Sequence, residues 1–167
     1  MKKPKLHPKS QFHLVVSANY ALWPKDRVLL CLGQWCTPLR EKNLWEGFNL
    51  TYAQPFVPSN FFQHANEAEK LKQFEEQLLK TLAPALNQIH GQTLTTRCWR
   101  ILLGNWLRRY ITVFFNRYHT LANCLSQNDV KGVTFHKIGS YSLATRHSDE
   151  FVHACNDPTW NAELWHA

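Results

Sequence analysis

The sequence predicts an α/β fold with short parallel strands and one long buried helix. Residues 12–17 (FHLVVS) and 27–32 (RVLLCL) are short apolar runs that indicate strands. The second run is continuously apolar, which is typical of a strand buried on both faces of a parallel sheet. Residues 95–125 repeat apolar side chains at helical spacing and therefore predict a long helix.

The segment after the second strand predicts less regular structure. That strand ends at Gly33, and residues 37–45 favour a short helix. Residues 49–60 contain Pro55 and Pro58, so they favour an extended loop.

A first long helix is expected to begin near Asn66. Acidic residues fall in its first turns, and its apolar residues recur at helical spacing: Leu71, Phe74, Leu78, Leu79 and Leu82. We expect Pro84 to kink or restart this helix, because proline has no backbone N–H to donate. Gly91, directly after His90, is expected to end it.

The second long helix, residues 95–125, is predicted to be buried on most of its circumference. Its apolar residues form two stripes, one of Trp99, Leu103, Trp106, Tyr110 and Val113 and one of Leu102, Leu107, Ile111, Phe114, Tyr118 and Leu121. Thr93 or Thr95 can cap its first turn. Gly104 lies mid-helix, where glycine costs about 1 kcal/mol relative to alanine. We therefore expect another element to approach the helix closely at Gly104.

The remaining elements near the C-terminus are short. Residues 133–138 predict a third strand, Ser148 can cap a helix, and Pro158 can open a last one. About three strands are fewer than a complete doubly wound domain generally has. We therefore expect the chain to be part of a larger protein.

Composition excludes several classes of protein. The 167 residues are 44% hydrophobic with a formal net charge of +7, but the lysines of the first nine residues supply much of that excess, so specific nucleic-acid binding is not expected. Arginines interrupt the most hydrophobic region, which excludes a membrane span. The five cysteines fit a reducing compartment and lack zinc-ligand spacing. We expect a cytoplasmic protein with a disordered basic tail over residues 1–11, one α/β domain over residues 12–167, no metal and no bound cofactor.

The end of the second strand is the first candidate site. Gly33 and Trp35 follow that strand directly, and α/β folds place ligands at the carboxyl ends of their strands. Glycine permits close approach, tryptophan offers a stacking face, and Cys36 offers a thiol. The alternative is a packed turn with an inert buried cysteine.

The turn between the two long helices is the second candidate site. His90 can act as a general base or can cap carbonyl groups at a helix end. Arg97 and Arg100 lie three residues apart in the first turns of a helix, where they can bind a phosphate or carboxylate. Alternatively, they form ion pairs with acidic residues of other elements.

Four segments of the chain stand in a recognisable order: LLCLGQWC, LAPALNQIHG, RCWRILLGNWL and SDEFVHACNDPTWNAELW. Together they resemble the amino-terminal part of a family of transferases found in bacterial O-antigen and surface-polysaccharide loci. The resemblance covers residues 12–165 and implies a partial Rossmann-like domain, similar to the amino-terminal half of a GT-B glycosyltransferase. The chain departs from the family pattern at Gln34, where an acidic residue is expected.

The resemblance implies the acceptor-side half of a sugar transferase that uses a nucleotide-sugar donor and is inactive alone. It implies three partners: a carboxy-terminal transferase domain on the same or a separate chain, a glycan or lipid-linked acceptor, and a peripheral contact at the inner face of the membrane. The candidate base is then His90, and the candidate substrate-binding residues are Gly33, Trp35, Arg97 and Arg100. Two other functions stay open, a non-catalytic scaffold and a non-specific nucleic-acid binder.

Overall fold

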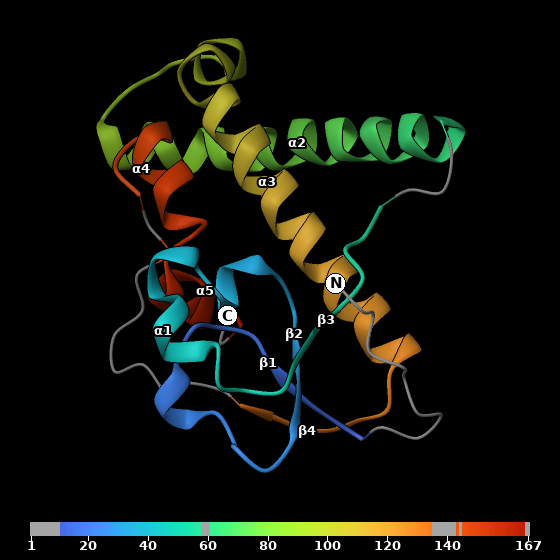
Figure 1. The fold of residues 1–167 in the computed structure, drawn as a ribbon. Coiled ribbons are helices and arrows are strands. Elements are labelled where there is room, and N and C mark those ends of the chain that lie inside the picture. Colours follow the sequence, from blue (N-terminus) through green and yellow to red (C-terminus); the bar gives the residue numbers. More distant parts are fainter. Residues whose placement is uncertain (1–10, 58–60, 135–142, 144, 166–167) are drawn as a thin grey trace. The chain divides into compact units, whose positions relative to one another are not determined.

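The computed structural model describes residues 11–57, 61–134, 143 and 145–165 (Figure 1). The chain divides into two compact units. The first unit comprises Met1–Phe56 and Tyr118–Ala167, and the second comprises Val57–Arg117. The tail expected over residues 1–11 lies outside the described residues except for Gln11.

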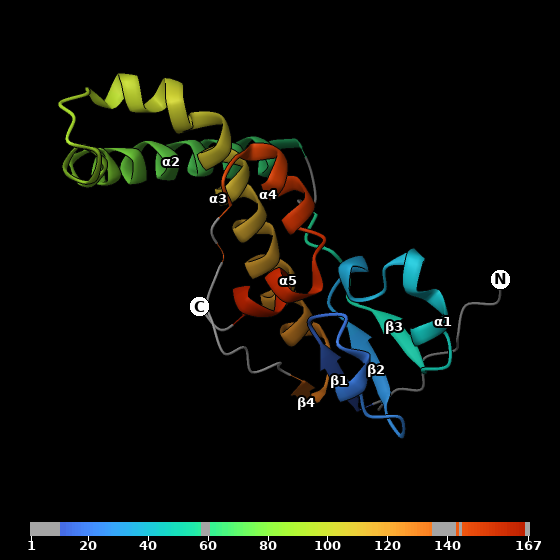
Figure 2. The same ribbon diagram turned by 90° about the vertical axis from the view of Figure 1, so that its left-hand side faces the viewer.

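The first unit contains a four-stranded parallel sheet in the order β3-β2-β1-β4. Its strands are β1 (Phe12–Val15), β2 (Val28–Cys31), β3 (Leu50–Tyr52) and β4 (Val130–Thr134). In Figure 2 the arrows of β1 and β2 lie side by side and point the same way. The predicted α/β fold with short parallel strands is therefore confirmed.

Two strands differ from the sequence prediction. β3 lies inside the segment expected to be an extended loop. Its three residues precede Pro55, and three residues are enough to form a short edge strand beside β2. β4 begins at Val130, three residues before the start of the predicted strand. The rest of that predicted strand, residues 135–138, lies outside the described residues.

The two central strands are buried on both faces, as the continuous apolar run of β2 predicts. Successive side chains of a strand point to opposite faces of the sheet. Leu14 and Leu30 belong to the apolar cluster on one face, which also contains Cys124. Val15 and Leu29 belong to the cluster on the other face. All of these residues are at most 2% exposed.

Short helices follow the strands at both ends of the first unit. The β2–β3 connection contains a 3₁₀ turn over Gln34–Cys36, another over Leu39–Glu41, and α1 (Lys42–Trp45). Near the C-terminus lie α4 (Ser148–Ala154) and α5 (Pro158–Leu164). Pro158 opens α5 as predicted, but His147 rather than Ser148 caps α4, because its imidazole nitrogen accepts a hydrogen bond from the Glu150 N–H.

The second unit is a helical hairpin of α2 (Phe61–His90) and most of α3 (Thr96–Gln127). Gly91 ends α2 as predicted and has a φ of +61°, a conformation that glycine adopts without steric cost. The N–H groups of Gln92 and Gly91 donate to the carbonyls of Asn87 and Gln88, which is the Schellman pattern of a helix C-terminus. α2 continues through Pro84 rather than restarting there.

Packing in the hairpin buries residues from both predicted stripes of α3. Trp99, Leu107 and Ile111 are at most 6% exposed and pack with Leu79 and Ala83 of α2. Burial of the second stripe is incomplete, since its members Leu102 and Tyr118 are 63% and 66% exposed. Thr95 caps the helix as predicted, with its hydroxyl oxygen accepting from the Cys98 N–H at 3.3 Å.

The explanation proposed for Gly104 is wrong. A Cβ atom built at Gly104 meets the Cγ of Arg100, in its own helix, at 3.5 Å, which is an ordinary contact. Among the described residues, no other element comes within 4 Å of that position. Glycine is therefore not required here by close packing of a second element.

Candidate functional site

A cavity of about 980 Å³ lies in the first unit. One side comes from the connection after β2 and from the end of β3, and includes Gln34, Trp35, Arg40, Trp45 and Tyr52. The other side comes from α4, α5 and their connection, and includes Glu150, His153, Asp157, Trp160 and Glu163. The cavity therefore lies at the carboxyl ends of parallel strands, where α/β folds bind ligands.

Gly33 and Trp35 depend on each other at the end of β2. The Trp35 indole packs directly over Gly33, where a Cβ atom would lie only 2.0 Å from the ring. The indole Nε1–H donates to the Val16 carbonyl at 2.9 Å, which fixes the ring against the end of β1. Only glycine at position 33 leaves room for this ring, and Trp35 then lines the cavity.

Two more aromatic rings of this side are held by hydrogen bonds at their polar ends. The Trp45 Nε1–H donates to the Pro38 carbonyl at 3.0 Å. The Tyr52 hydroxyl and the Thr37 hydroxyl are 2.7 Å apart and form a hydrogen bond. Because the polar ends are occupied, these rings present carbon surface to a ligand.

Carboxylates come from the opposite side of the cavity. Asp157 Oδ1 accepts hydrogen bonds from the N–H groups of Thr159 and Trp160 at 2.8 and 2.9 Å, and so caps α5. The fully buried Asn161 donates to the carbonyls of Cys155 and Asp157, which holds the α4–α5 connection in place. Glu163, near the end of α5, is 6% exposed and lines the cavity.

The described lining of the cavity has an excess of negative charge. It contains the carboxylates of Glu150, Asp157 and Glu163, against the single guanidinium of Arg40. Arg40 is itself paired, since its Nε–H donates to Glu41 at 3.3 Å. Such a lining repels anions and suits neutral or positively charged ligands.

The other candidate residues, His90, Arg97 and Arg100, belong to the second unit. His90 is exposed at the end of α2, with its ring centroid 5.8 Å from that of Trp99. Arg97 is exposed on the first turn of α3. The five candidates are thus divided between two units, with only Gly33 and Trp35 beside the cavity.

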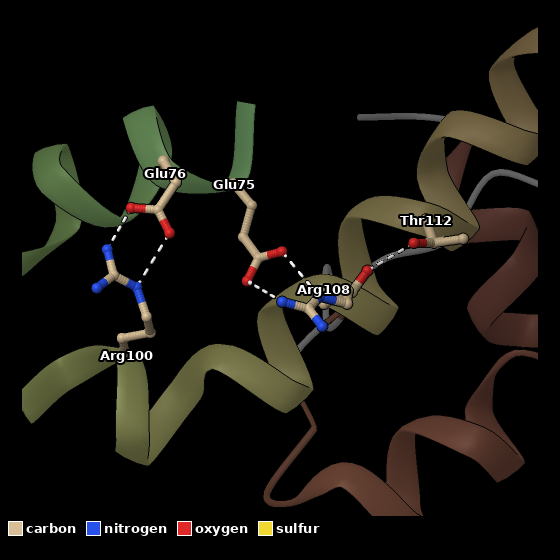
Figure 3. Close-up of polar contacts among 5 residues, drawn as sticks. All are labelled: Glu75, Glu76, Arg100, Arg108 and Thr112. Atoms are coloured by element: carbon tan, nitrogen blue, oxygen red, sulfur yellow. Dashed lines mark hydrogen bonds and ion pairs between the residues drawn. The ribbon is translucent and has the colours of Figure 1, made fainter. Parts of the chain in front are cut away.

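Ion pairs engage two arginines of α3 (Figure 3). The Arg100 guanidinium donates to both carboxylate oxygens of Glu76, with its Nε–H at 3.0 Å from Oε1. The Arg108 Nε–H donates to Glu75 at 3.0 Å. The ion-pair alternative thus describes Arg100 in this structure.

A family model described as LIC12162 family transferase matches residues 12–167. The chain belongs to this family of transferases. The match to the LIC12162 family covers the parallel sheet, both long helices and all the residues named around the cavity. Comparison with curated proteins and with solved structures gives no match.

The described part of this LIC12162 family member gives no support to a nucleophilic thiol beside the cavity or to a metal site. Cys31 and Cys36 are buried in the core, and burial raises the pKa of the Cys31 thiol above its usual range. The described residues contain no cluster of three metal-ligating side chains.

None of the described helices combines the length and apolar character needed to cross a bilayer.

Sequence reasoning missed the side of the cavity that α4 and α5 supply. Glu150, Asp157 and Glu163 are not among the site residues that the sequence predicts. The sequence signal that was available is the pair Asp157-Pro158, a capping residue before a first-turn proline. It locates the start of α5 but not the strands that α5 faces.

Proposed function

We propose that the chain is the acceptor-side half of a sugar transferase that acts in O-antigen or surface-polysaccharide biosynthesis. The observation that carries this proposal is the aromatic cavity at the carboxyl ends of β2 and β3. Family membership supports the transferase part of the proposal. The cavity supports its sugar part.

Sugar rings match the chemistry of this lining. A pyranose has C–H faces that pack against the electron-rich faces of aromatic rings such as Trp35, Trp45 and Tyr52. Its hydroxyl groups donate hydrogen bonds to carboxylate oxygens, which the lining supplies at Glu150 and Glu163. The negative charge disfavours a nucleoside diphosphate in the same place, so the cavity suits the acceptor rather than the donor.

The donor belongs elsewhere in this proposal. A carboxy-terminal transferase domain, on the same or a separate chain, holds the nucleotide sugar, and Arg97 and Arg100 contact its diphosphate. For Arg100 this requires exchange of the Glu76 carboxylate for a phosphate. His90 of the second unit stays the candidate general base of the complete enzyme.

A lipid-linked acceptor determines where the reaction takes place. If the acceptor glycan is attached to a membrane lipid, the chain works at the inner face of the membrane. The basic residues 1–11 then favour anionic headgroups. Sedimentation with anionic vesicles, with and without residues 1–11, tests this part of the proposal; we expect binding that depends on the tail and declines with salt.

Acceptor binding can be tested with a pair of matched tyrosine variants. Tyr52→Ala removes a 44% exposed ring from the cavity, whereas Tyr118→Ala removes a 66% exposed tyrosine that does not line it. We expect quenching of tryptophan fluorescence by methyl glycosides in the wild type, affinity about tenfold weaker in Tyr52→Ala, and no change in Tyr118→Ala. Absence of glycoside binding, or equal losses in both variants, overturns the proposal. Glycoside binding without transfer when the carboxy-terminal domain and nucleotide sugars are added favours a non-catalytic binding module.

A further inference from the structure

Charge distribution around the cavity restricts the sugar that it can take. The three carboxylates, Glu150, Asp157 and Glu163, all come from the segment formed by α4 and α5. Asp157 uses Oδ1 to cap α5, and Glu150 accepts a hydrogen bond from the Arg146 N–H. Neither of these two contacts brings a positively charged side chain to the carboxylate. An acidic sugar would bring a further carboxylate close to those of Glu150 and Asp157.

Positive charge on the cavity side is weak by comparison. The Arg40 side chain is 71% exposed and pairs with Glu41, which also accepts a hydrogen bond from the Tyr20 hydroxyl at 3.0 Å. His153 is 81% exposed, and its Nε2 lies 3.9 Å from the Asp149 carboxylate. No other lysine, arginine or histidine belongs to the described lining. Both of these cationic side chains are mostly exposed, so the described lining offers little positive charge to a bound carboxylate or phosphate.

The aromatic side favours cations as well as sugar faces. Trp35 and Trp45 donate their N–H groups to backbone carbonyls, so the ligand meets their carbon surface. A cation over the face of tryptophan or tyrosine is attracted by the ring quadrupole, most strongly where water is excluded. Aromatic rings on one side and carboxylates on the other favour a ligand that has both a ring with C–H faces and an ammonium group.

We propose that the acceptor carries a free, positively charged amino group, as an amino sugar does; this inference rests on the proposed function. An acidic sugar is then rejected. The sugar ring packs on the aromatic side that includes Trp35 and Tyr52. The ammonium group donates its hydrogen bonds to the carboxylates of the α4–α5 side, where Glu163 is the most deeply buried.

Four methyl glycosides of one ring shape test this inference: those of glucosamine, N-acetylglucosamine, glucose and glucuronic acid. Calorimetry of each with the wild-type chain should give about tenfold tighter binding of the glucosaminide than of the glucoside. The N-acetyl compound, which has lost the charge, should bind like the glucoside, and the glucuronide should bind most weakly. Equal affinities, or tightest binding of the glucuronide, overturn the inference and leave the proposed function standing. Binding of none of the four overturns both.

Charge-neutralising variants separate the cavity from the general charge of the protein. Glu150→Gln keeps the size and the acceptor oxygen of the side chain but removes its charge. Glu46→Gln is the matched control, since Glu46 is 58% exposed, does not line the cavity and has only an i,i+4 contact with Lys42. We expect Glu150→Gln to weaken the glucosaminide more than the glucoside, so that the preference falls severalfold, and Glu46→Gln to change neither affinity. The same loss in both variants overturns the assignment of the amine to this cavity.

Discussion

The side-chain oxygen Oδ1 of Asn87 accepts a hydrogen bond from the Trp99 indole Nε1–H at 2.9 Å. The same oxygen accepts from the Leu94 N–H at 3.0 Å, and the Asn87 Nδ2 donates to the Leu94 carbonyl at 2.9 Å. One amide thus satisfies three polar groups of the turn that joins α2 to α3. Asn87 therefore ties the end of α2 to the first turn of α3.

Asn87→Ala should destabilise the helical hairpin. Removing the amide leaves the Trp99 N–H and the Leu94 backbone groups without these partners, which we expect to cost about 2 kcal/mol. Urea unfolding followed by circular dichroism measures this change. Asn105→Ala is the control, because Asn105 is exposed on α3; it should raise the unfolding midpoint slightly through helix propensity rather than lower it. A midpoint for Asn87→Ala equal to that of the control would contradict the role given to the amide.

Two glycines of the hairpin should respond to alanine with opposite signs. At Gly104 a Cβ meets only the Arg100 Cγ at 3.5 Å, so Gly104→Ala should stabilise the hairpin by up to about 1 kcal/mol through helix propensity. At Gly91 the φ of +61° is unfavourable for alanine, so Gly91→Ala should destabilise it by about 1 kcal/mol. Thermal unfolding of both variants tests the pair. A lower melting temperature for Gly104→Ala would mean that Gly104 meets a constraint outside the described contacts.

The two ion pairs of the hairpin should differ in their contribution to stability. Glu75 is only 6% exposed in its side chain, so Arg108→Met leaves a largely buried carboxylate without its charged partner. We expect a loss of about 1 to 3 kcal/mol. The Arg100–Glu76 pair is more exposed, at 43% and 36%, and Arg100→Met should cost at most about 0.5 kcal/mol. Chemical denaturation at two salt concentrations measures both. Equal losses would show that burial of Glu75 does not govern the difference.

Local sequence patterns predicted the parts of this structure that depend on local interactions. Gly33 and Trp35 could be placed at the carboxyl end of β2 because strand, glycine and turn follow one another in the chain. Glu163 could not be assigned to the same cavity, since it lies about 130 residues away and reaches it only through the topology of the first unit. The pairing of Arg100 with Glu76 is likewise a contact between distant residues, so the sequence left ligand binding and ion pairing as alternatives.

Gly33→Ala should disrupt the cavity without affecting the second unit. The new Cβ would lie 2.0 Å from the Trp35 ring, so the indole must leave its place and lose its hydrogen bond to Val16. We expect altered tryptophan fluorescence and loss of glycoside binding, with the helical circular dichroism signal retained. Gly47→Ala is the matched control, because a Cβ at Gly47 has nothing within 4 Å. Unchanged glycoside affinity in Gly33→Ala would argue against Trp35 as part of the binding surface.

Thiol reactivity should separate Cys98 from the buried cysteines and should depend on pH. The Thr95 hydroxyl donates to the Cys98 sulfur at 3.3 Å, and this hydrogen bond stabilises the thiolate and lowers the pKa of Cys98. Burial raises the pKa of Cys31 and Cys124 instead. Because the thiolate is the reactive form, alkylation of Cys98 should rise at a lower pH than alkylation of an ordinary thiol, while Cys31 and Cys124 should react only after unfolding. Thr95→Val removes the hydroxyl and should move the pH profile of Cys98 to higher values. Mass spectrometry of iodoacetamide-treated protein across pH 6 to 9 measures each site, and an identical profile in Thr95→Val would exclude the Thr95 hydroxyl as the cause.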